Sequence, residues 1–377
     1  MSDKLSLAIF CRVVDNYGDI GICWRLARQL QAEHGVAVTL WVDDLASFKR
    51  ICPDIVVDLA QQTVAGVSVR HWASQDEAFV PADIADIVVE FFACDIPPAY
   101  IAAMAQCTPR PVWLNLEGLT AEEWVEGCHT LPSMHPQLPL TKHFFFPGFT
   151  AKTGGLLRET ALIDARRAFQ ADLAAQAAFL ARFGVTASEL AMTKVSLFCY
   201  PQAPVAALLQ AWRDGTAPVL CLVPEGVAVD AVRPFIGTRG ALTVRVLPFV
   251  PQPDYDRLLW ACDLNLVRGE DSFVRAQWAG KPFIWHIYEQ DEHLHHVKLR
   301  AFLKRYAHPA VTAFSLAWNG VDTGVAPDWP ALSQALLSDA AGIAARADAW
   351  QQEMLTYGDL TGNLLDFACS LRAKTLI

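Results

Sequence analysis

The feature that most constrains the fold is a repeated alternation of short apolar runs with segments of helical periodicity. In the first half of the 377 residues, strand-like runs cover residues 5–14, 36–42, 84–92 and 112–116. Between the first two runs, apolar side chains at 20–30 recur every three or four residues, which forms one face of a helix. Near-continuous apolar strands separated by helices predict a parallel sheet that is covered on both faces.

The alternation breaks once and then restarts. Residues 132–155 hold four prolines and a Gly-Gly pair, a composition typical of a domain connection. An Ala-rich helical region at 157–183 follows it. We then expect strands at 194–198, 218–223, 242–247, 264–267 and 282–286, helices at 204–213, 254–261 and 272–278, and a helical tail at 329–371.

This order of elements predicts two doubly wound α/β domains with a cleft between them. The expected first domain covers residues 1–155 and the second covers residues 191–345. A helical region at 156–190 joins them, and we expect the tail at 346–377 to pack back on the first domain. A chain of this length suits two domains of ~150 residues each.

Composition excludes several classes of protein. With 53% hydrophobic residues the chain is not disordered, and a net charge of −10 without a concentrated basic stripe argues against nucleic-acid binding. No apolar run reaches the ~18 residues that a membrane span needs, and the N-terminus lacks a signal peptide's features. The ten cysteines are scattered without a CxxC pair. We therefore expect a cytoplasmic protein with reduced cysteines and neither a membrane nor a nucleic-acid partner.

The first loop with unusual residues, at 15–19, follows a strand and precedes a helix. Gly18 and Gly21 alone do not form the dinucleotide fingerprint GxGxxG. Asp15 and Asp19 place two carboxylates beside a helix N-terminus, where the helix dipole is expected to keep Asp19 ionised. Such a pair can hold a cation or accept a proton. The alternative is an ordinary Asp N-cap with Asp15 in a turn, and the residues alone leave both open.

The second such loop, residues 268–272, also lies between a strand and a helix. Arg268 supplies a positive charge, Gly269 permits close approach of the backbone to a ligand, and Ser272 can cap the helix. Together with free backbone N–H groups they predict a phosphate site that needs no metal. Glu270 and Asp271 must then point aside, toward sugar hydroxyls or toward Arg268. The alternative is a capped helix with a local ion pair.

Two weaker patterns raise the possibility of a metal. Residues 254–256 form an Asp-x-Asp motif, but both carboxylates also suit the first turn of a helix after a proline, which we favour. His286, His293, His295 and His296 do not match a helical two-histidine pair at i, i+4, and no cysteine lies nearby. We favour a solvated helix face for these histidines.

Four segments of the chain together resemble the EarP family of protein-arginine rhamnosyltransferases. The first is Val-Asp-Asn-Tyr-Gly-Asp-Ile-Gly-Ile-Cys-Trp-Arg-Leu-Ala-Arg at 14–28, and the others are 197–200, 248–252 and 268–282 in the same order. Cys199, where a small residue is expected, is the one local departure. The resemblance runs nearly end to end.

The resemblance implies a GT-B fold, in which two Rossmann-like domains face each other across the cleft that holds the active site. It implies dTDP-β-L-rhamnose as the donor, bound by the C-terminal domain, and no metal or other cofactor. The implied acceptor is one arginine of elongation factor P, whose modification supports translation of polyproline. Transfer is expected to invert the anomeric centre.

The resemblance also implies roles for residues. We expect Asp19 to be the general base and Asp15 to orient the guanidinium, with these two roles open to exchange. Glu270 is expected to act on the sugar or the acceptor. The other residues expected to bind the donor are Asn16, Tyr17, Gly18, Phe198, Tyr200, Phe249, Gln252, Arg268, Gly269, Asp271, Ser272 and Tyr288.

Two alternatives stay open without the resemblance. One is a nucleotide-sugar enzyme with another acceptor, including an epimerase, which would act without a protein partner. The other is a nucleotide-binding protein without chemistry. The pair Asp15 and Asp19 argues against a pure binder, because binding alone does not require two crowded carboxylates.

Overall fold

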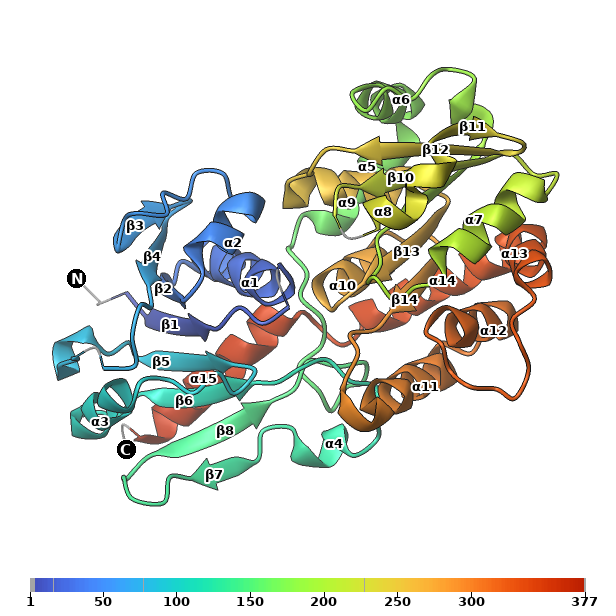
Figure 1. Cartoon of the computed structure of the whole chain (residues 1–377). Coiled ribbons are helices and arrows are strands. Elements are labelled where there is room, and N and C mark those ends of the chain that lie inside the picture. The colour runs from blue at the N-terminus through green and yellow to red at the C-terminus, as the bar shows by residue number, and fades with distance from the viewer. Residues whose placement is uncertain (1–3, 16, 77, 227, 376–377) are drawn as a thin grey trace. The chain divides into compact units, whose positions relative to one another are not determined.

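The computed structural model describes residues 4–15, 17–76, 78–226 and 228–375, and its contacts divide the chain into two compact units (Figure 1). Unit 1 consists of Met1–Thr160 and Met354–Ile377, and unit 2 of Ala161–Glu353. The helical region expected to join two domains, at 156–190, is therefore divided between the units after Thr160.

The described residues of unit 1 form an eight-stranded sheet in the order β3-β4-β2-β1-β5-β6-β8-β7. The inner pairings are parallel, and the outer pairs β3–β4 and β7–β8 are antiparallel. The strands are β1 (Ser6–Cys11), β2 (Ala37–Val42), β3 (Gln61–Val64), β4 (Val67–His71), β5 (Ile87–Phe91), β6 (Val112–Leu116), β7 (Pro132–Met134) and β8 (Thr141–Phe145). The helical elements are α1 (Gly18–His34), α2 (Leu45–Ile51), η1 (Pro81–Asp83), α3 (Pro98–Gln106), α4 (Val125–Cys128) and α15 (Leu360–Thr375).

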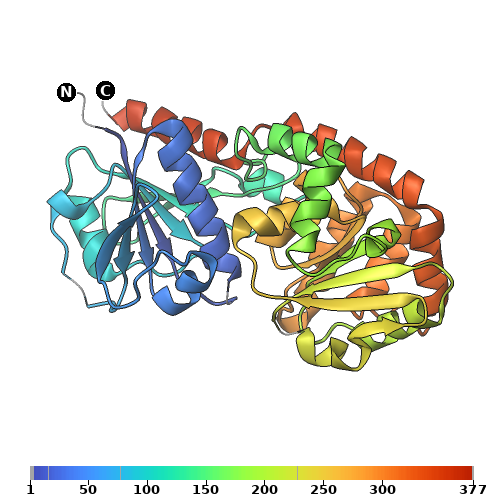
Figure 2. The ribbon, with the colours of Figure 1, turned by 90° about the horizontal axis from the view of Figure 1, so that it is seen from above.

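Helices cover both faces of the unit 1 sheet. Successive side chains of a strand point to opposite faces, and both sets are buried along the inner strands. On one face, Ala8 and Phe10 of β1 join a buried cluster with Tyr100 and Met104 of α3. Helix α1 packs against β1 and β2, and Figures 1 and 2 show α1 and α3 on opposite sides of the sheet. Helix α15 packs against β6 and α1. The four strands expected in this half, with both faces buried, are confirmed.

Residues 132–155, whose composition predicts a connection between domains, lie within unit 1 and form strands. They supply β7 and β8, which pair antiparallel at the edge of the sheet. Pro132 is the first residue of the edge strand, where a missing N–H does not interrupt the sheet. The prediction of a connection from this proline-rich composition is therefore wrong.

The described part of unit 2 contains a six-stranded sheet in the order β11-β12-β10-β9-β13-β14, parallel except for β11. Its strands are β9 (Thr193–Leu197), β10 (Val219–Pro224), β11 (Gly237–Arg239), β12 (Leu242–Leu247), β13 (Leu264–Arg268) and β14 (Phe283–His286). The five strands predicted for this half are confirmed. The helices are α5 (Leu162–Ala171), α6 (Leu173–Ala181), η2 (Glu189–Ala191), α7 (Val205–Asp214), α8 (Val229–Val232), η3 (Arg233–Phe235), α9 (Gln252–Ala261), α10 (Asp271–Trp278), η4 (Asp291–His293), α11 (Leu294–Tyr306), α12 (Pro309–Trp318), α13 (Trp329–Ser338) and α14 (Ala340–Leu355).

The core of unit 2 unites segments that are distant in sequence. Phe179 of α6 and Leu258 of α9 pack with Leu220 and Leu222 of β10 in one buried cluster. The Ala-rich region is broken into α5 and α6 at Asp172, whose carboxylate accepts a hydrogen bond from Ala175 N at 2.8 Å and caps α6. In the described chain, no helix combines the length and the apolar character needed to cross a membrane.

Candidate active site

The loop after β1 leaves the carboxyl edge of the unit 1 sheet. Because Cys11 at the end of β1 pairs with Val42 at the end of β2, the segments that follow both strands emerge side by side. Ligands of open parallel sheets bind at this edge. The loop carries the candidate residues Asp15, Tyr17, Gly18 and Asp19, and the candidate Asn16 lies outside the described residues.

Asp19 is the second residue of α1 and is buried, with 6% of its surface exposed. Its Oδ2 accepts hydrogen bonds from the backbone N–H groups of Val14 at 2.7 Å and Asp15 at 2.8 Å. The N-cap position belongs to Tyr17, which makes no side-chain cap bond. The interpretation of Asp19 as an ordinary N-cap is therefore wrong: its carboxylate folds the preceding loop back over the helix end.

The environment of Asp19 favours the protonated carboxyl. Burial raises the pKa of Asp19, and the nearby carboxylates of Asp15 and Asp43 raise it further, against the lowering effect of the two backbone hydrogen bonds. The helix N-terminus was expected to keep this group readily ionised, but desolvation outweighs that effect. A carboxylate with a raised pKa is a better proton acceptor at neutral pH than an ordinary aspartate.

Asp43 is a third carboxylate at this edge, which the sequence reasoning missed. It follows β2 directly, and its Oδ1 accepts a hydrogen bond from Val13 N at 2.9 Å. The signal that could have identified Asp43 is its place immediately after a strand next to β1.

Asp15 and Gly18 form the turn between strand and helix. Gly18 N donates to Asp15 O at 2.7 Å. A Cβ at Gly18 would lie 3.0 Å from Asp15 Oδ2, so the glycine permits the Asp15 carboxylate to lie close against the start of α1. The ring of Tyr17 lies below the guanidinium of Arg50, at 5.8 Å from the ring centroid.

The second loop, in unit 2, has the same local architecture. β13 ends at Arg268, Gly269 adopts a positive φ of 62°, Glu270 is the N-cap residue and α10 begins at Asp271. Ser272 Oγ accepts a hydrogen bond from Arg268 N at 3.1 Å and donates one to Arg268 O. The expectation that Ser272 caps the helix is wrong, because its hydroxyl closes the loop onto the end of the strand.

Arg268 is buried, with 8% of its surface exposed. β9 pairs with β13, so the residues that follow β9 reach Arg268: its guanidinium carbon lies 4.4 Å from the ring centroid of Phe198 and 4.8 Å from that of Tyr200. Within the described residues, no carboxylate forms an ion pair with Arg268. A buried guanidinium held by aromatic rings, without a counter-charge, is suited to bind an anion.

His286, the last residue of β14, holds Tyr200 in place. Tyr200 N donates to His286 Nδ1 at 3.1 Å. Burial, Arg268 and His295 lower the pKa of His286 to about 3, so the ring stays a neutral acceptor. The Tyr200 ring also meets that of Tyr288, which is 45% exposed, edge to face at 5.6 Å. The prediction of a solvated face is wrong for His286 and His295, which are both buried.

The remaining candidates of unit 2 lie near the start of α10. Gln252 Nε2 donates to Asp271 Oδ2 at 3.4 Å, which joins the first residue of α9 to the first residue of α10. Phe249 and Glu270 are half-buried. Unit 2 thus brings its candidates together around the carboxyl ends of β9 and β13, as unit 1 does around β1.

Both carboxylates of the Asp-x-Asp motif at 254–256 form ion pairs with arginines. Asp256 makes a buried two-point ion pair with Arg275, at 3.0 and 2.7 Å. Asp254, in the first turn of α9, pairs with Arg182 at 2.7 Å. Asp254 thus lies in the first turn of a helix, as we expect, but Asp256 is the fifth residue of α9 and lies beyond that turn.

The fold resembles that of solved glycosyltransferase structures. A solved MurG structure from Acinetobacter baumannii is similar over 97% of this chain and 99% of that chain, with a TM-score of 0.54 and 13% identity. The chain therefore has the α/β architecture of the GT-B glycosyltransferases.

The family follows from closer similarities. The family model described as "Elongation-Factor P (EF-P) rhamnosyltransferase EarP" matches residues 7–369, and the chain belongs to this family. A protein-arginine rhamnosyltransferase of Pseudomonas putida is 51% identical, over 88% of this chain and 93% of that protein. One of Pseudomonas aeruginosa is 47% identical, over 96% of each. A solved structure described as the basis for EarP-mediated arginine glycosylation of translation elongation factor EF-P has 35% identity and a TM-score of 0.66, over 97% of this chain and 99% of that one.

Proposed function

We propose that this protein transfers L-rhamnose from dTDP-β-L-rhamnose to one arginine side chain of elongation factor P, with inversion at the anomeric carbon and without a metal. The observation that carries the proposal is the buried Asp19 carboxylate, held by two backbone N–H groups and with a raised pKa. The names of the Pseudomonas relatives and of the EarP structure support the same reaction.

The acceptor sets the chemical difficulty of the reaction. An arginine guanidinium stays protonated at neutral pH and its nitrogen lone pairs are delocalised, so it is a poor nucleophile. A carboxylate is complementary to the guanidinium in charge and in hydrogen-bonding geometry. Asp15 orients one nitrogen toward the sugar, and Asp19 accepts the proton from that nitrogen as the new bond forms.

The donor requires a stable leaving group. As the guanidinium nitrogen attacks C1 of rhamnose, the bond between C1 and the diphosphate oxygen breaks and dTDP leaves with the electron pair. Arg268 and the backbone N–H groups at the start of α10 stabilise the negative charge that develops on the diphosphate. They thereby supply the charge stabilisation that a metal ion provides in other transferases.

The aromatic side chains and amides of unit 2 bind the rest of the donor. Phe249 and Gln252 hold the thymine, and Tyr200 with Tyr288 contacts the diphosphate and the sugar. The Phe198 ring supports Arg268, whose guanidinium carbon lies 4.4 Å from the ring centroid. Glu270 acts on the sugar or the acceptor from its position before α10.

The test is the intact mass of unmodified elongation factor P after incubation with this protein and dTDP-β-L-rhamnose in EDTA. We expect the mass of one deoxyhexose to be added, and no addition when the acceptor arginine is replaced by lysine. An unchanged mass with consumed donor would favour an enzyme that acts on the free sugar nucleotide. An unchanged mass with intact donor would reduce the protein to a binder and would refute the role of Asp19.

A further inference from the structure

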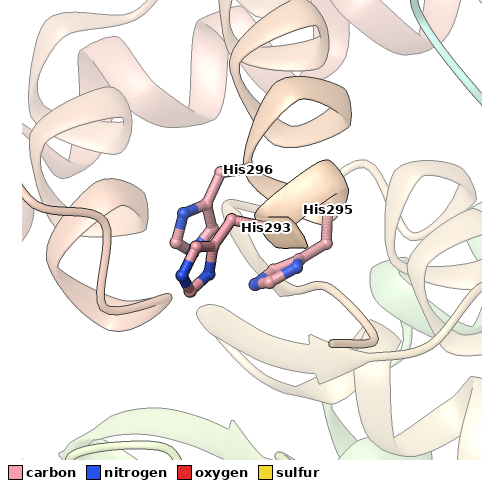
Figure 3. Close-up of side chains that lie close together, drawn as sticks. All are labelled: His293, His295 and His296. Atoms are coloured by element: carbon pink, nitrogen blue, oxygen red, sulfur yellow. The ribbon is translucent and has the colours of Figure 1, made fainter. Parts of the chain in front are cut away.

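Three histidine side chains lie together in unit 2, beyond the end of β14. The ligand nitrogens of His293, His295 and His296 all lie within 4.8 Å of one another. Figure 3 shows the ring of His295 pointing toward the other two, which come from the same short stretch of chain. We propose that these three imidazoles bind one divalent transition-metal ion of the zinc class, at a site separate from the sugar-transfer chemistry.

The backbone explains why the sequence spacing gave no sign of this cluster. Glu292 and His293, the last two residues of η4, adopt positive φ values of 54° and 58°, so the chain is not helical just before α11. This turn returns the His293 side chain toward the first turn of α11. The rings of His293 and His296 then lie with centroids 5.2 Å apart and planes within 10°.

The distances between the rings match those around a single ion. Two imidazoles that share a tetrahedral zinc, with Zn–N bonds of ~2.0 Å, have ring centroids ~5 Å apart. Here the centroids of His295 and His296 are separated by 4.2 Å and those of His293 and His295 by 5.9 Å. His293 is the exposed member of the three.

Hydrogen bonds already orient two of the rings as metal ligands. His296 Nε2 donates to Asn319 O at 3.1 Å. His295 Nδ1 lies 3.2 Å from Gln290 O and 3.1 Å from Gln290 N, and it donates to the carbonyl in the tautomer that carries the proton on Nδ1. A ring N–H that donates to a backbone carbonyl leaves the lone pair on the other nitrogen, and metal-bound histidines are typically held in this way. His296 therefore offers Nδ1, and His295 offers Nε2 in the tautomer that is protonated on Nδ1.

The charges around the cluster favour a cation. Glu289 acts on His295 electrostatically, and Asp291 and Glu292 lie in the same turn. Imidazole ligands suit Zn²⁺, Ni²⁺, Cu²⁺ and Co²⁺, and three of them leave one coordination position for water.

The experiment is a titration of the metal-free full-length chain, without an affinity tag, with Co²⁺ followed by visible absorption and then displaced by Zn²⁺. We expect one ion per chain. His293→Gln and His296→Gln should each weaken binding by roughly tenfold or more, since each removes one of three ligands. His34→Gln, an exposed histidine at the end of α1, is the matched control and should bind as the wild type does.

A thermal readout separates loss of the site from loss of the fold. In EDTA the wild type and both glutamine variants should unfold at the same temperature, and Zn²⁺ should raise the transition of the wild type alone. Absence of saturable Co²⁺ binding to the wild type would overturn the proposal. Equal binding by the His293→Gln/His296→Gln double variant would overturn it as well, since the ion would then lie elsewhere.

Discussion

The two candidate loops share one local architecture and differ in charge. In each unit a parallel strand ends, a short loop follows and a helix begins. The second helical residue then bonds back to the backbone N–H of the loop or of the strand end. In unit 1 this residue is Asp19, which binds the N–H groups of Val14 and Asp15. In unit 2 it is Ser272, which binds Arg268 N.

The difference in charge suits the first loop to accept a proton and the second loop to bind an anion. The Asp19 carboxylate satisfies loop N–H groups itself and repels a second anion, so the first loop is suited to accept a proton from a cationic group. The Ser272 hydroxyl is neutral, and it leaves the buried Arg268 charge and the α10 N-terminus available to an anion. The fold sets the position of each loop, and one side chain at an equivalent place sets its role.

The largest expected effect comes from replacing the Asp19 carboxylate of the first loop by a neutral amide. Asp19→Asn should lower the rate of arginine rhamnosylation by roughly 10²–10⁴, because a general base is lost. The folded protein should not be destabilised at neutral pH. The pKa of Asp19 is raised, so its contribution to stability is present at low pH and lost as pH rises through that pKa.

The measurement for Asp19 combines transfer rates, donor binding and thermal unfolding. Donor binding should survive in Asp19→Asn, and the exposed Asp58→Asn serves as the control. In the wild type, kcat/KM should fall on acidification through a pKa above the ordinary aspartate range. A near-normal rate in Asp19→Asn would assign the base to another group.

The next effect concerns the cation of the second loop. Arg268→Gln should lower kcat/KM for the donor by roughly 10²-fold, because charge-assisted contacts to the diphosphate disappear. Arg268→Lys should recover only part of this loss, since lysine keeps the charge without the planar group that stacks on Phe198 and Tyr200. Steady-state kinetics measure both effects. The control is Arg245→Lys, because Arg245 forms a partly exposed ion pair with Glu189. Full recovery by lysine would limit Arg268 to a point charge.

A smaller effect is expected at Ser272, which takes in unit 2 the place that Asp19 has in unit 1. Ser272→Ala removes the hydroxyl that joins Arg268 N and Arg268 O, at a cost of ~1 kcal/mol per hydrogen bond. The donor KM should rise roughly tenfold while α10 stays folded, because alanine favours a helix. Circular dichroism and donor kinetics test this, with Ser338→Ala as the control. A fall in kcat at unchanged KM would contradict the loop-closing role.

The smallest effect concerns His286 and is a change in pH dependence. Its folded-state pKa, about 3, lies below its ordinary value of 6.5, so the neutral ring stabilises the fold above pH 6.5 and this contribution is lost toward pH 3. His286→Gln keeps an acceptor for Tyr200 N and should flatten the fall of the unfolding temperature across that interval. An unchanged pH profile would show that His286 titrates normally.

The architecture was largely predictable because it depends on local patterns. The strands predicted at 112–116 and 242–247 are β6 and β12 with the same bounds, since strands inside a covered sheet consist mostly of apolar side chains. Residues 132–155 were harder to predict. Prolines mark both connections and edge strands, and only the pairing of β7 with β8 distinguishes these cases.

The sequence by itself determined the two α/β halves, the two loops at strand ends and the family, because periodicity and motifs are properties of neighbouring residues. The tertiary structure decided the direction of the Asp19 pKa, the presence of Asp43 beside it and the neutral state of His286. It also decided the convergence of His293 with His295 and His296. Desolvation and hydrogen bonding depend on which distant segments pack around a group, and chain spacing does not encode that packing.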